Sequence, residues 1–255
     1  MAQHTQTRTL AGQVAFVTGA SSGLGRATAI SLAQAGANLV LLARSADELA
    51  ETGAQVTACG RQALVAPVDV AREDQIVAAV EQAIGRFGRI DLLVNAAGTD
   101  VPGPVAKVTV EGWDHVLAVN LRAPFVLAKA VFPHMRRAGH GTIVNVSSVA
   151  GKRGWANAAA YCASKFGLTG LTQVLAAEGK PHGIRACIVY PGGMATNWGA
   201  WAPLERSTPR RKAPAPTDAL PPEEVAALIV WIASAPSELV LNEAIITPLE
   251  ERGWP

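Results

Sequence analysis

The chain has 255 residues, of which 49% are hydrophobic and 16% are charged, and its formal net charge is +2. This composition excludes a disordered chain and supplies enough apolar side chains for a well-buried core. A net charge this small provides no basic field that would attract nucleic acid or an anionic membrane. We therefore expect one folded domain over residues 1–255.

Three features predict a cytoplasmic protein. The first twelve residues are polar, so no signal peptide is predicted. No uninterrupted apolar run approaches the ~20 residues that a bilayer-spanning helix needs, so we expect no membrane partner. The three cysteines, Cys59, Cys162 and Cys187, are odd in number and lack the spacing of a metal site, a usage typical of a reducing compartment.

Short apolar runs alternate with longer amphipathic stretches, the pattern of a parallel sheet with helices on both faces. The strand candidates are rich in Val, Ile and Leu, and we expect them to be buried on both faces. In chain order they are Val14–Thr18, Asn38–Leu42, Ala63–Pro67, Leu92–Asn95, Thr142–Ser147, Arg185–Tyr190 and Ala244–Thr247. The helix candidates include Leu24–Ala35, Glu73–Phe87, Leu121–Arg137, Ala158–Glu178 and Glu223–Ala233. With right-handed crossovers, these elements predict a three-layer α/β fold around a doubly wound parallel sheet, a Rossmann fold.

The composition changes between Trp198 and Pro222, where five prolines lie from Pro203 to Pro221. This segment follows the carboxyl end of a strand, the edge at which open α/β sheets bind their ligands. A long irregular segment at that edge is typical of a lid. We interpret residues 198–222 as a substrate-binding loop within the single domain.

The first strand leads directly into a glycine-rich segment and then into a helix. Glycine lets the backbone turn tightly and approach a pyrophosphate, and a helix N-terminus favours the negative charge of that group. The spacing of Gly19, Gly23 and Gly25 is one residue wider at the first gap than in the better-known dinucleotide fingerprint. The residues predicted to bind the dinucleotide here are Gly19, Ser21, Ser22, Gly23, Leu24 and Gly25.

The end of the second strand predicts NADP(H) rather than NAD(H). An acidic residue there would hold the ribose hydroxyls of NAD(H), but this chain has neutral Ala43 followed by Arg44. A guanidinium can bind the 2′-phosphate of NADP(H) through charge-assisted hydrogen bonds. The alternatives are that Arg44 stacks on the adenine or points to solvent.

Two further strand ends complete the predicted cofactor site. Asp69 and Val70 follow the third strand, and the Asp69 carboxylate can accept a hydrogen bond from the adenine amino group, although a helix N-cap would also explain it. Asn95, Ala96 and Gly98 close the fourth strand. Their small side chains leave room for a dinucleotide across the edge of the sheet.

Tyr161 and Lys165 are four residues apart in a predicted helix, so their side chains share one face. Alone they could be a surface pair, but Ser148 lies at the end of the preceding strand. Hydride delivery to a carbonyl carbon leaves negative charge on oxygen, which must be protonated as it forms. A phenol with an ordinary pKa near 10 can take this role if a neighbouring cation stabilises its phenolate.

In these motifs the chain resembles the short-chain dehydrogenase/reductase family, in its branch of roughly 250-residue, single-domain members. The resemblance runs from Val14 to about Ala235 and implies an enzyme with Tyr161 as general acid/base. It also implies that Lys165 binds the nicotinamide ribose and lowers the pKa of the tyrosine, and that Ser148 polarises the substrate carbonyl.

The same resemblance assigns further positions. Asn120 would hold a water in the proton relay. Asn95 begins the family's Asn-Asn-Ala-Gly motif, whose second asparagine is Ala96 in this chain. In the family's Pro-Gly segment, Thr196 would contact the nicotinamide carboxamide. Pro191, Gly192 and Met194 of the same segment would also bind the cofactor, as would Tyr161 and Lys165.

The resemblance also implies that the substrate pocket is lined by residues after Ser148 and after Pro191. These are Val149, Trp155, Met194, Trp198 and Trp201. Apolar and aromatic walls favour a hydrophobic ketone or secondary alcohol. The tryptophans could instead belong to the core or an interface. Lys152 and Arg153 could attract an acidic substrate, although a solvated loop pair is the favoured interpretation.

We therefore expect an NADP(H)-dependent oxidoreductase, a carbonyl reductase or alcohol dehydrogenase, that moves hydride between the nicotinamide and a ketone or secondary alcohol. The alternatives are a 3-oxoacyl thioester reductase, a non-catalytic nucleotide-binding protein, and a hydroxy-acid dehydrogenase, which the stretch from Asn242 to Pro248 suggests. The helices Leu121–Arg137 and Ala158–Glu178 resemble the family's four-helix subunit interface, so we expect a homodimer or homotetramer. The tail Gly253-Trp254-Pro255 is either an interface element or disordered.

Overall fold

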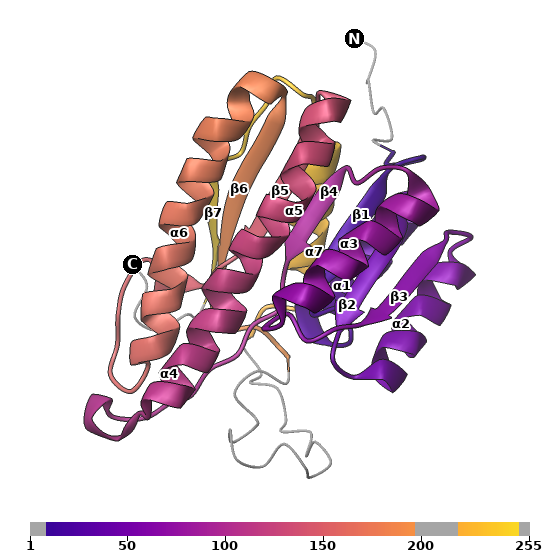
Figure 1. The fold of residues 1–255 in the computed structure, drawn as a ribbon. Helices are drawn as coiled ribbons and strands as arrows, with labels where there is room; N and C mark the ends of the chain where they lie inside the picture. Colours follow the sequence, from indigo (N-terminus) through magenta and orange to yellow (C-terminus); the bar gives the residue numbers. More distant parts are fainter. Residues whose placement is uncertain (1–8, 197–218, 250–255) are drawn as a thin grey trace.

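The computed structural model describes residues 9–196 and 219–249, and its centre is one parallel sheet (Figure 1). The order of the seven strands is β3-β2-β1-β4-β5-β6-β7, and every neighbouring pair is parallel. The order reverses between β1 and β4, which is the switch point where open α/β sheets bind ligands. The strands are β1 (Val14–Thr18), β2 (Asn38–Ala43), β3 (Ala63–Pro67), β4 (Leu92–Asn95), β5 (Gly141–Val146), β6 (Ile184–Pro191) and β7 (Glu243–Ile246).

Helices cover both faces of the sheet and make three layers (Figure 1). One face packs against α1 (Gly23–Gln34), α2 (Ala46–Ala58) and α7 (Pro222–Ser234). The other packs against α3 (Glu73–Phe87), α5 (Ala123–Ala138) and α6 (Ala159–Gly179). Each face has its own apolar core because alternate side chains of a strand point to opposite sides. The predicted three-layer, doubly wound fold is therefore confirmed.

The predicted strands and helices all form, with ends that shift by at most two residues. The prediction that every strand is buried on both faces is wrong for the two edge strands. β3 and β7 keep half-exposed and exposed side chains, whereas β1 and β4 are buried throughout. An edge strand has a neighbour on one side only, so solvent reaches it despite its apolar sequence.

The stretch Val110–Ala138 is helical throughout and contains a change of helix type. It begins as α4 (Val110–Leu117), passes through the π-helical turn Ala118–Arg122 and continues as α5. Its length and apolar composition would suffice to cross a membrane, but half of its apolar 18-residue segment is buried within the protein. This weak signal is what a core helix also produces. A π turn within an α-helix frequently marks a functional site.

Buried polar groups tie the central strands together near their carboxyl ends. Thr18 at the end of β1 accepts hydrogen bonds from the backbone N–H groups of Ala96 and Ala97, at 3.1 and 3.0 Å. The Asn95 amide donates to Asn145 Oδ1 at 2.7 Å, and the Asn145 amide donates to Thr172 on α6 at 2.8 Å. These bonds fix the loop after β4 and helix α6 relative to the sheet edge.

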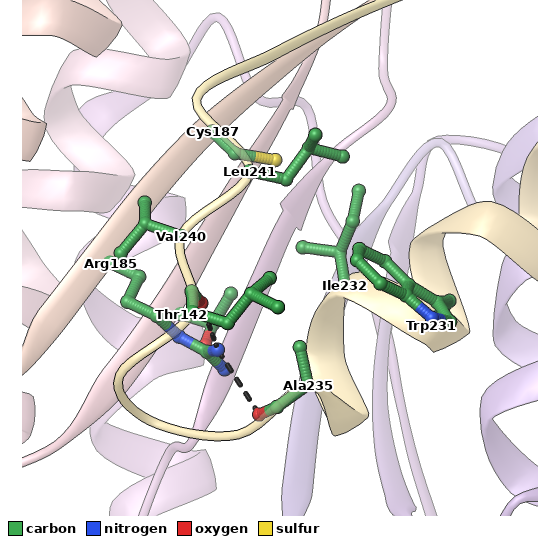
Figure 2. A pocket seen from close by; sticks show the side chains of 9 residues that line it. Thr142, Arg185, Cys187, Trp231, Ile232, Ala235, Val240 and Leu241 are labelled. Atoms are coloured by element: carbon green, nitrogen blue, oxygen red, sulfur yellow. Dashed lines mark hydrogen bonds between the residues drawn. The ribbon is translucent and has the colours of Figure 1, made fainter.

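At the amino end of the sheet, Arg185 closes a hollow between β6 and the segment after α7 (Figure 2). Its guanidinium donates to the hydroxyl of Thr142 at 3.0 Å and to the carbonyl of Ala235 at 3.1 Å. It also donates to the carbonyls of Pro236 and Leu239. The accessible volume is about 10 Å³, about enough for one water. No substrate fits there.

Candidate active site

The turn from β1 into α1 leaves no space for side chains at two glycines. Gly19 has φ of 68°, and a Cβ on it would lie 3.0 Å from the backbone of Ala97. A Cβ on Gly25 would lie 2.2 Å from the carbonyl oxygen of Gly19. Main-chain atoms of the turn therefore pack directly against each other and against the backbone after β4. The absence of side chains lets a large anionic ligand approach the main chain.

The N-terminus of α1 fits an anion. Its N-cap, Ser22, makes no side-chain capping bond, and no acidic residue lies in the first turn. By contrast, α2, α3 and α7 each place two acidic residues in the first turn. The partial positive charge of α1 is thus left without an acidic side chain, beside a turn that brings the backbone close. Gly19, Ser21, Ser22, Gly23, Leu24 and Gly25 all lie on this turn, and they fit a cofactor pyrophosphate.

Arg44 lies at the carboxyl end of β2 and is exposed. Within the described ranges it forms no hydrogen bond or ion pair with another residue. Asp69 lies half-buried after β3, where its Oδ1 accepts a hydrogen bond from the N–H of Ala71 at 3.0 Å. The alternative of a helix cap does not hold, because the N-cap of α3 is Arg72. Arg44 and Asp69 thus lie on adjacent strand ends, next to the turn before α1.

The remaining predicted cofactor residues lie along the same edge. Ala96 and Gly98 are half-buried after β4, and Val70 is buried. Pro191 ends β6, and Gly192 donates its N–H to the carbonyl of Ile246 at 2.8 Å. Met194 pairs with Leu220, just before α7. Thr196 packs over the glycine turn, 3.4 Å from where a Cβ on Gly23 would be.

Tyr161 and Lys165 lie on α6 and are 9% and 4% exposed. The Lys165 ammonium donates to the carbonyl oxygen of Val146 at 2.8 Å and lies 5.6 Å from the centre of the Tyr161 ring. A side-chain hydrogen bond joins Ser148 to Tyr161. Neither member of the tyrosine–lysine pair is a surface residue, so the alternative of a surface pair is wrong.

Gly151 lets the segment that carries Ser148 approach α6. Ser148 is the N-cap of a 3₁₀ turn (Val149–Gly151), and its hydroxyl accepts from the N–H of Ala150 at 3.2 Å. A Cβ on Gly151 would lie 2.6 Å from Ser147 Oγ and 2.9 Å from the carbonyl oxygen of Lys165. The serine end of β5 and the lysine turn of α6 can therefore pack together only with glycine at this position.

Burial dominates the proton affinities of the site. It raises the pKa of Tyr161, and the hydrogen bond from Ser148 opposes this in part. The charges of Asp100 and Cys162 raise the same pKa further. Burial lowers the pKa of Lys165 to about 8. Tyr161 is therefore a neutral phenol at neutral pH, the form that can donate a proton.

Asn120 occupies the centre of the π turn and connects two parts of the site. Its Oδ1 accepts from the N–H of Thr99 at 2.8 Å, and its amide donates to the carbonyl of Thr99 at 2.8 Å. The second amide hydrogen bond goes to Ser164 on α6 at 3.0 Å. Asn120 thus holds the loop after β4 against the helix that carries Tyr161. Both N–H donors of its side chain are used by protein groups.

Sequence reasoning missed Asp100. This residue follows Thr99 in the loop after β4 and is close enough for its charge to act on Tyr161. Burial raises the pKa of its own carboxyl. The signal that could have found it was an acidic residue five positions past Asn95, at the ligand-binding edge of the sheet.

The predicted substrate residues have different surroundings. Val149 is 7% exposed and Met194 is half-buried, whereas Trp155 is 44% exposed. Trp198, Trp201 and most of the predicted loop 198–222, like the tail Gly253-Trp254-Pro255, lie outside the described residues.

The predicted solvated pair of Lys152 and Arg153 is wrong for its first member. Lys152 forms an ion pair with Glu243 on β7, and its ammonium lies 4.5 Å from the centre of the Tyr190 ring. Arg153 is exposed. The Lys152 charge is thus neutralised at the sheet edge, because β7 places an acidic residue beside it.

The described residues contain no cluster of three or more His, Cys, Asp or Glu side chains that could hold a metal ion. Cys59, Cys162 and Cys187 are free thiols. Burial raises the pKa of Cys187 to about 12, so its thiol stays protonated.

Comparison with curated proteins finds relatives that match nearly the whole chain. The chain is 36% identical over 252 residues to a short chain dehydrogenase/reductase, astE, of Aspergillus oryzae, with 96% of this chain and 97% of the relative covered. It is also 36% identical over 233 residues to a D-threitol dehydrogenase of Mycolicibacterium smegmatis, which covers 91% and 89% of the two chains.

Solved structures agree with this fold. A metagenomic short-chain oxidoreductase in complex with NADP has a TM-score of 0.81, at 35% identity and coverage of 94% and 98%. Carveol dehydrogenase from Mycobacterium avium in complex with NAD has a TM-score of 0.85, at 27% identity and coverage of 93% and 97%. The short chain dehydrogenase family profile matches residues 13–203. The chain belongs to the short-chain dehydrogenase/reductase family, whose members are oxidoreductases that use a nicotinamide cofactor.

Proposed function

We propose that this protein is an NADP(H)-dependent oxidoreductase that interconverts a ketone and a secondary alcohol, with an apolar carbonyl compound as substrate. The observation that carries this proposal is the constellation at the carboxyl end of the sheet. There the hydroxyls of Ser148 and Tyr161 are hydrogen-bonded to each other, with the ammonium of Lys165 buried behind the tyrosine ring.

The proposed roles follow from this geometry. When bound, the nicotinamide supplies the hydride. Tyr161 donates its proton to the substrate oxygen in the reduction and takes it back in the oxidation. Ser148 donates a hydrogen bond to the same oxygen and so stabilises the negative charge that develops there. Lys165 places a positive charge near the phenolate, which offsets the effect of burial on the tyrosine pKa.

The preference for NADP(H) rests on the end of β2. A neutral Ala43 precedes Arg44, whose exposed guanidinium has no partner among the described residues and is available to a 2′-phosphate. The phosphate would lie beside the turn that holds the pyrophosphate. Relatives with NADP and with NAD share the fold, so this residue, and not the fold, carries the preference.

The substrate assignment rests on the predicted pocket residues Val149, which follows Ser148 directly, and Met194, which follows β6, together with the predicted tryptophans. D-threitol dehydrogenase, one of the relatives, is named for a polyol, so a hydroxylated substrate also fits the scaffold. The rival activities, 3-oxoacyl thioester reduction and hydroxy-acid oxidation, use the same hydroxyl pair and differ only in what lines the pocket.

A cofactor-depletion screen tests the proposal. Purified protein is mixed with NADPH, or with NADH in parallel, and loss of absorbance at 340 nm is followed with ketones, aldehydes, keto acids and acetoacetyl thioesters. We expect NADPH-dependent reduction of apolar ketones. A higher kcat/KM with the thioester or a keto acid favours a rival activity, and absence of turnover with every compound rejects the enzymatic proposal.

We also propose a cytoplasmic homodimer or homotetramer assembled through α5 and α6. Phe125, Phe166 and Val174 are about half exposed on these helices. A groove of about 580 Å³ lies between α4 and α6 and is lined in part by Phe125. An apolar surface of this kind is typical of a subunit contact. Light scattering at micromolar concentration should give a dimeric or tetrameric mass, and a monomeric mass contradicts the assembly.

A further inference from the structure

The loop after β4 holds one carboxylate against the candidate active site. Its start is fixed because Asn120 bonds both the N–H and the carbonyl of Thr99. Its end is fixed because the N–H of Gly103 donates to the carbonyl of Asn157 at 2.9 Å, immediately before α6. Asp100 lies between these two anchors, so its backbone is held beside the first turn of the helix that carries Tyr161.

The Asp100 carboxylate is only partly satisfied by the protein. Its Oδ1 accepts a hydrogen bond from the N–H of Val101 at 2.7 Å. In the part of the chain that the structure describes, Oδ2 accepts no hydrogen bond and no cation pairs with the group. The side chain is half-buried, and burial raises its pKa. A substrate that covers this oxygen must offer it a hydrogen-bond donor or leave a charged acceptor unpaired, which is costly.

The charges around the site favour a neutral donor over a charged one. The Lys165 ammonium lies behind the Tyr161 ring and repels a substrate cation. The Asp100 carboxylate repels a substrate anion. Lys152, in the loop after Ser148, is already paired with Glu243, and its neighbour Arg153 is exposed. A hydroxyl group can donate to Asp100 without meeting either repulsion.

We propose that Asp100 is a specificity-determining residue that selects substrates with a second hydroxyl group next to the reacting carbon and excludes substrates with a carboxylate there. In this arrangement the second hydroxyl donates to Oδ2 while the reacting oxygen meets Ser148 and Tyr161. The inference rests on the proposed function, because it assumes that carbonyl reduction takes place at the tyrosine hydroxyl. It narrows the proposed ketone and secondary alcohol to α-hydroxyketones and vicinal diols that are apolar apart from these two oxygens, and it disfavours hydroxy acids.

The test compares three matched substrates: a ketone, the same ketone with an α-hydroxyl group, and the 2-keto acid of the same chain length. Each is reduced with NADPH by the wild type, Asp100→Asn, Asp100→Ala and the control Glu111→Gln. Glu111 is exposed in the first turn of α4, so its variant removes one negative charge away from the hydroxyl pair.

We expect the wild type and Glu111→Gln to prefer the hydroxyketone over the plain ketone by about tenfold or more in kcat/KM, the effect of a hydrogen bond to a charged group. Asp100→Ala should abolish this preference and leave the plain ketone within about threefold of wild type. Asp100→Asn keeps an acceptor for Val101 and should raise kcat/KM for the keto acid about tenfold.

A second readout separates an electrostatic role from a structural one. The titratable groups whose charges raise the pKa of Tyr161 are Cys162 on its own helix and Asp100 on the facing loop. The Lys165 ammonium, also on α6, lies 5.6 Å from the centre of the ring. The Asp100 charge raises the tyrosine pKa, so removing it lowers that pKa. The rising limb of the pH profile for alcohol oxidation should therefore move to lower pH in Asp100→Asn. Glu111→Gln should leave it in place.

The outcomes distinguish the two proposals. If no ketone is reduced by the wild type, the proposed function fails. If the wild type reduces ketones but Asp100→Asn and Asp100→Ala keep its substrate ratios and pH profile, the proposed function stands and the role of Asp100 is rejected. A preference for an α-amino ketone over the α-hydroxyketone also rejects it. If Asp100→Ala does not fold, Asp100→Asn provides the test. Its two readouts are kcat/KM for the keto acid and the position of the rising limb in the pH profile of alcohol oxidation.

Discussion

The two ends of the parallel sheet differ in whether their polar side chains are hydrogen-bonded within the protein. At the amino end, Asp91 accepts hydrogen bonds from the N–H of Val14 and from Arg89, and it also lies beside His140. Arg185 at the same end donates to five acceptors. At the carboxyl end, Arg44 is exposed and the first turn of α1 has no acidic side chain.

This difference separates polar groups that hold the fold from those available to a ligand. Buried polar groups are almost always hydrogen-bonded, because leaving one unpaired costs about 1–3 kcal/mol. Asp91 and Arg185 at the amino end follow this rule within the protein itself. The carboxyl end keeps Arg44, Asp100 Oδ2 and a helix N-terminus open, so a bound cofactor and substrate can complete their hydrogen bonds.

The largest effect on activity should come from Tyr161→Phe. The change removes one oxygen at the carboxyl end, and turnover should fall by about 10²- to 10⁴-fold, the usual contribution of a general acid–base group. Thermal stability should stay close to that of the wild type, because the ring and its packing remain. Stopped-flow or steady-state turnover with NADPH and a calorimetric melting temperature check both parts. Near-normal turnover would show that Tyr161 is not the general acid/base.

Arg44→Asp should have an intermediate effect, confined to one cofactor. A charge-assisted hydrogen bond to a 2′-phosphate contributes about 1.5–3 kcal/mol, so the affinity for NADPH should fall about 10- to 100-fold. Affinity for NADH should fall little or rise, since the new carboxylate can accept from the ribose hydroxyls. Titration calorimetry with both cofactors measures this. Equal losses of affinity for NADPH and NADH would show that Arg44 does not bind the 2′-phosphate.

Asp91→Ala should have the smallest effect on activity and a clear effect on stability. It leaves the N–H of Val14 and the guanidinium of Arg89 without their shared acceptor, which should lower the free energy of unfolding by about 1–3 kcal/mol. The kcat/KM of the folded enzyme should be unchanged, because Asp91 lies at the opposite end of the strands from Tyr161. Urea unfolding and turnover of the same sample test it. A large loss of turnover at unchanged stability would contradict the conclusion that polar groups at the amino end stabilise the fold and do not take part in activity.

The sequence was sufficient for the elements that local patterns define. Buried strands such as Val14–Thr18 and Leu92–Asn95 read as apolar runs, and Glu73–Phe87 reads as an amphipathic helix. The glycine turn was equally readable, because its requirement is a local one for missing side chains.

What the sequence did not reveal depends on strand position and on distant partners. β3 and β7 look like central strands, and only the strand order makes them edges. Lys152 looks like a solvated residue until β7 brings Glu243 beside it. Asp100 looks like an ordinary loop residue until Asn120 fixes its loop against α6.

The sequence by itself therefore determined the α/β fold and its glycine turn and named a set of candidate site residues, because each depends on residue types at fixed spacing along the chain. Tertiary structure alone decided which polar groups are paired and which stay open, and that Asp100 acts on Tyr161. The physical reason is that pairing and desolvation depend on distances between residues about 60 positions apart, which no local pattern encodes.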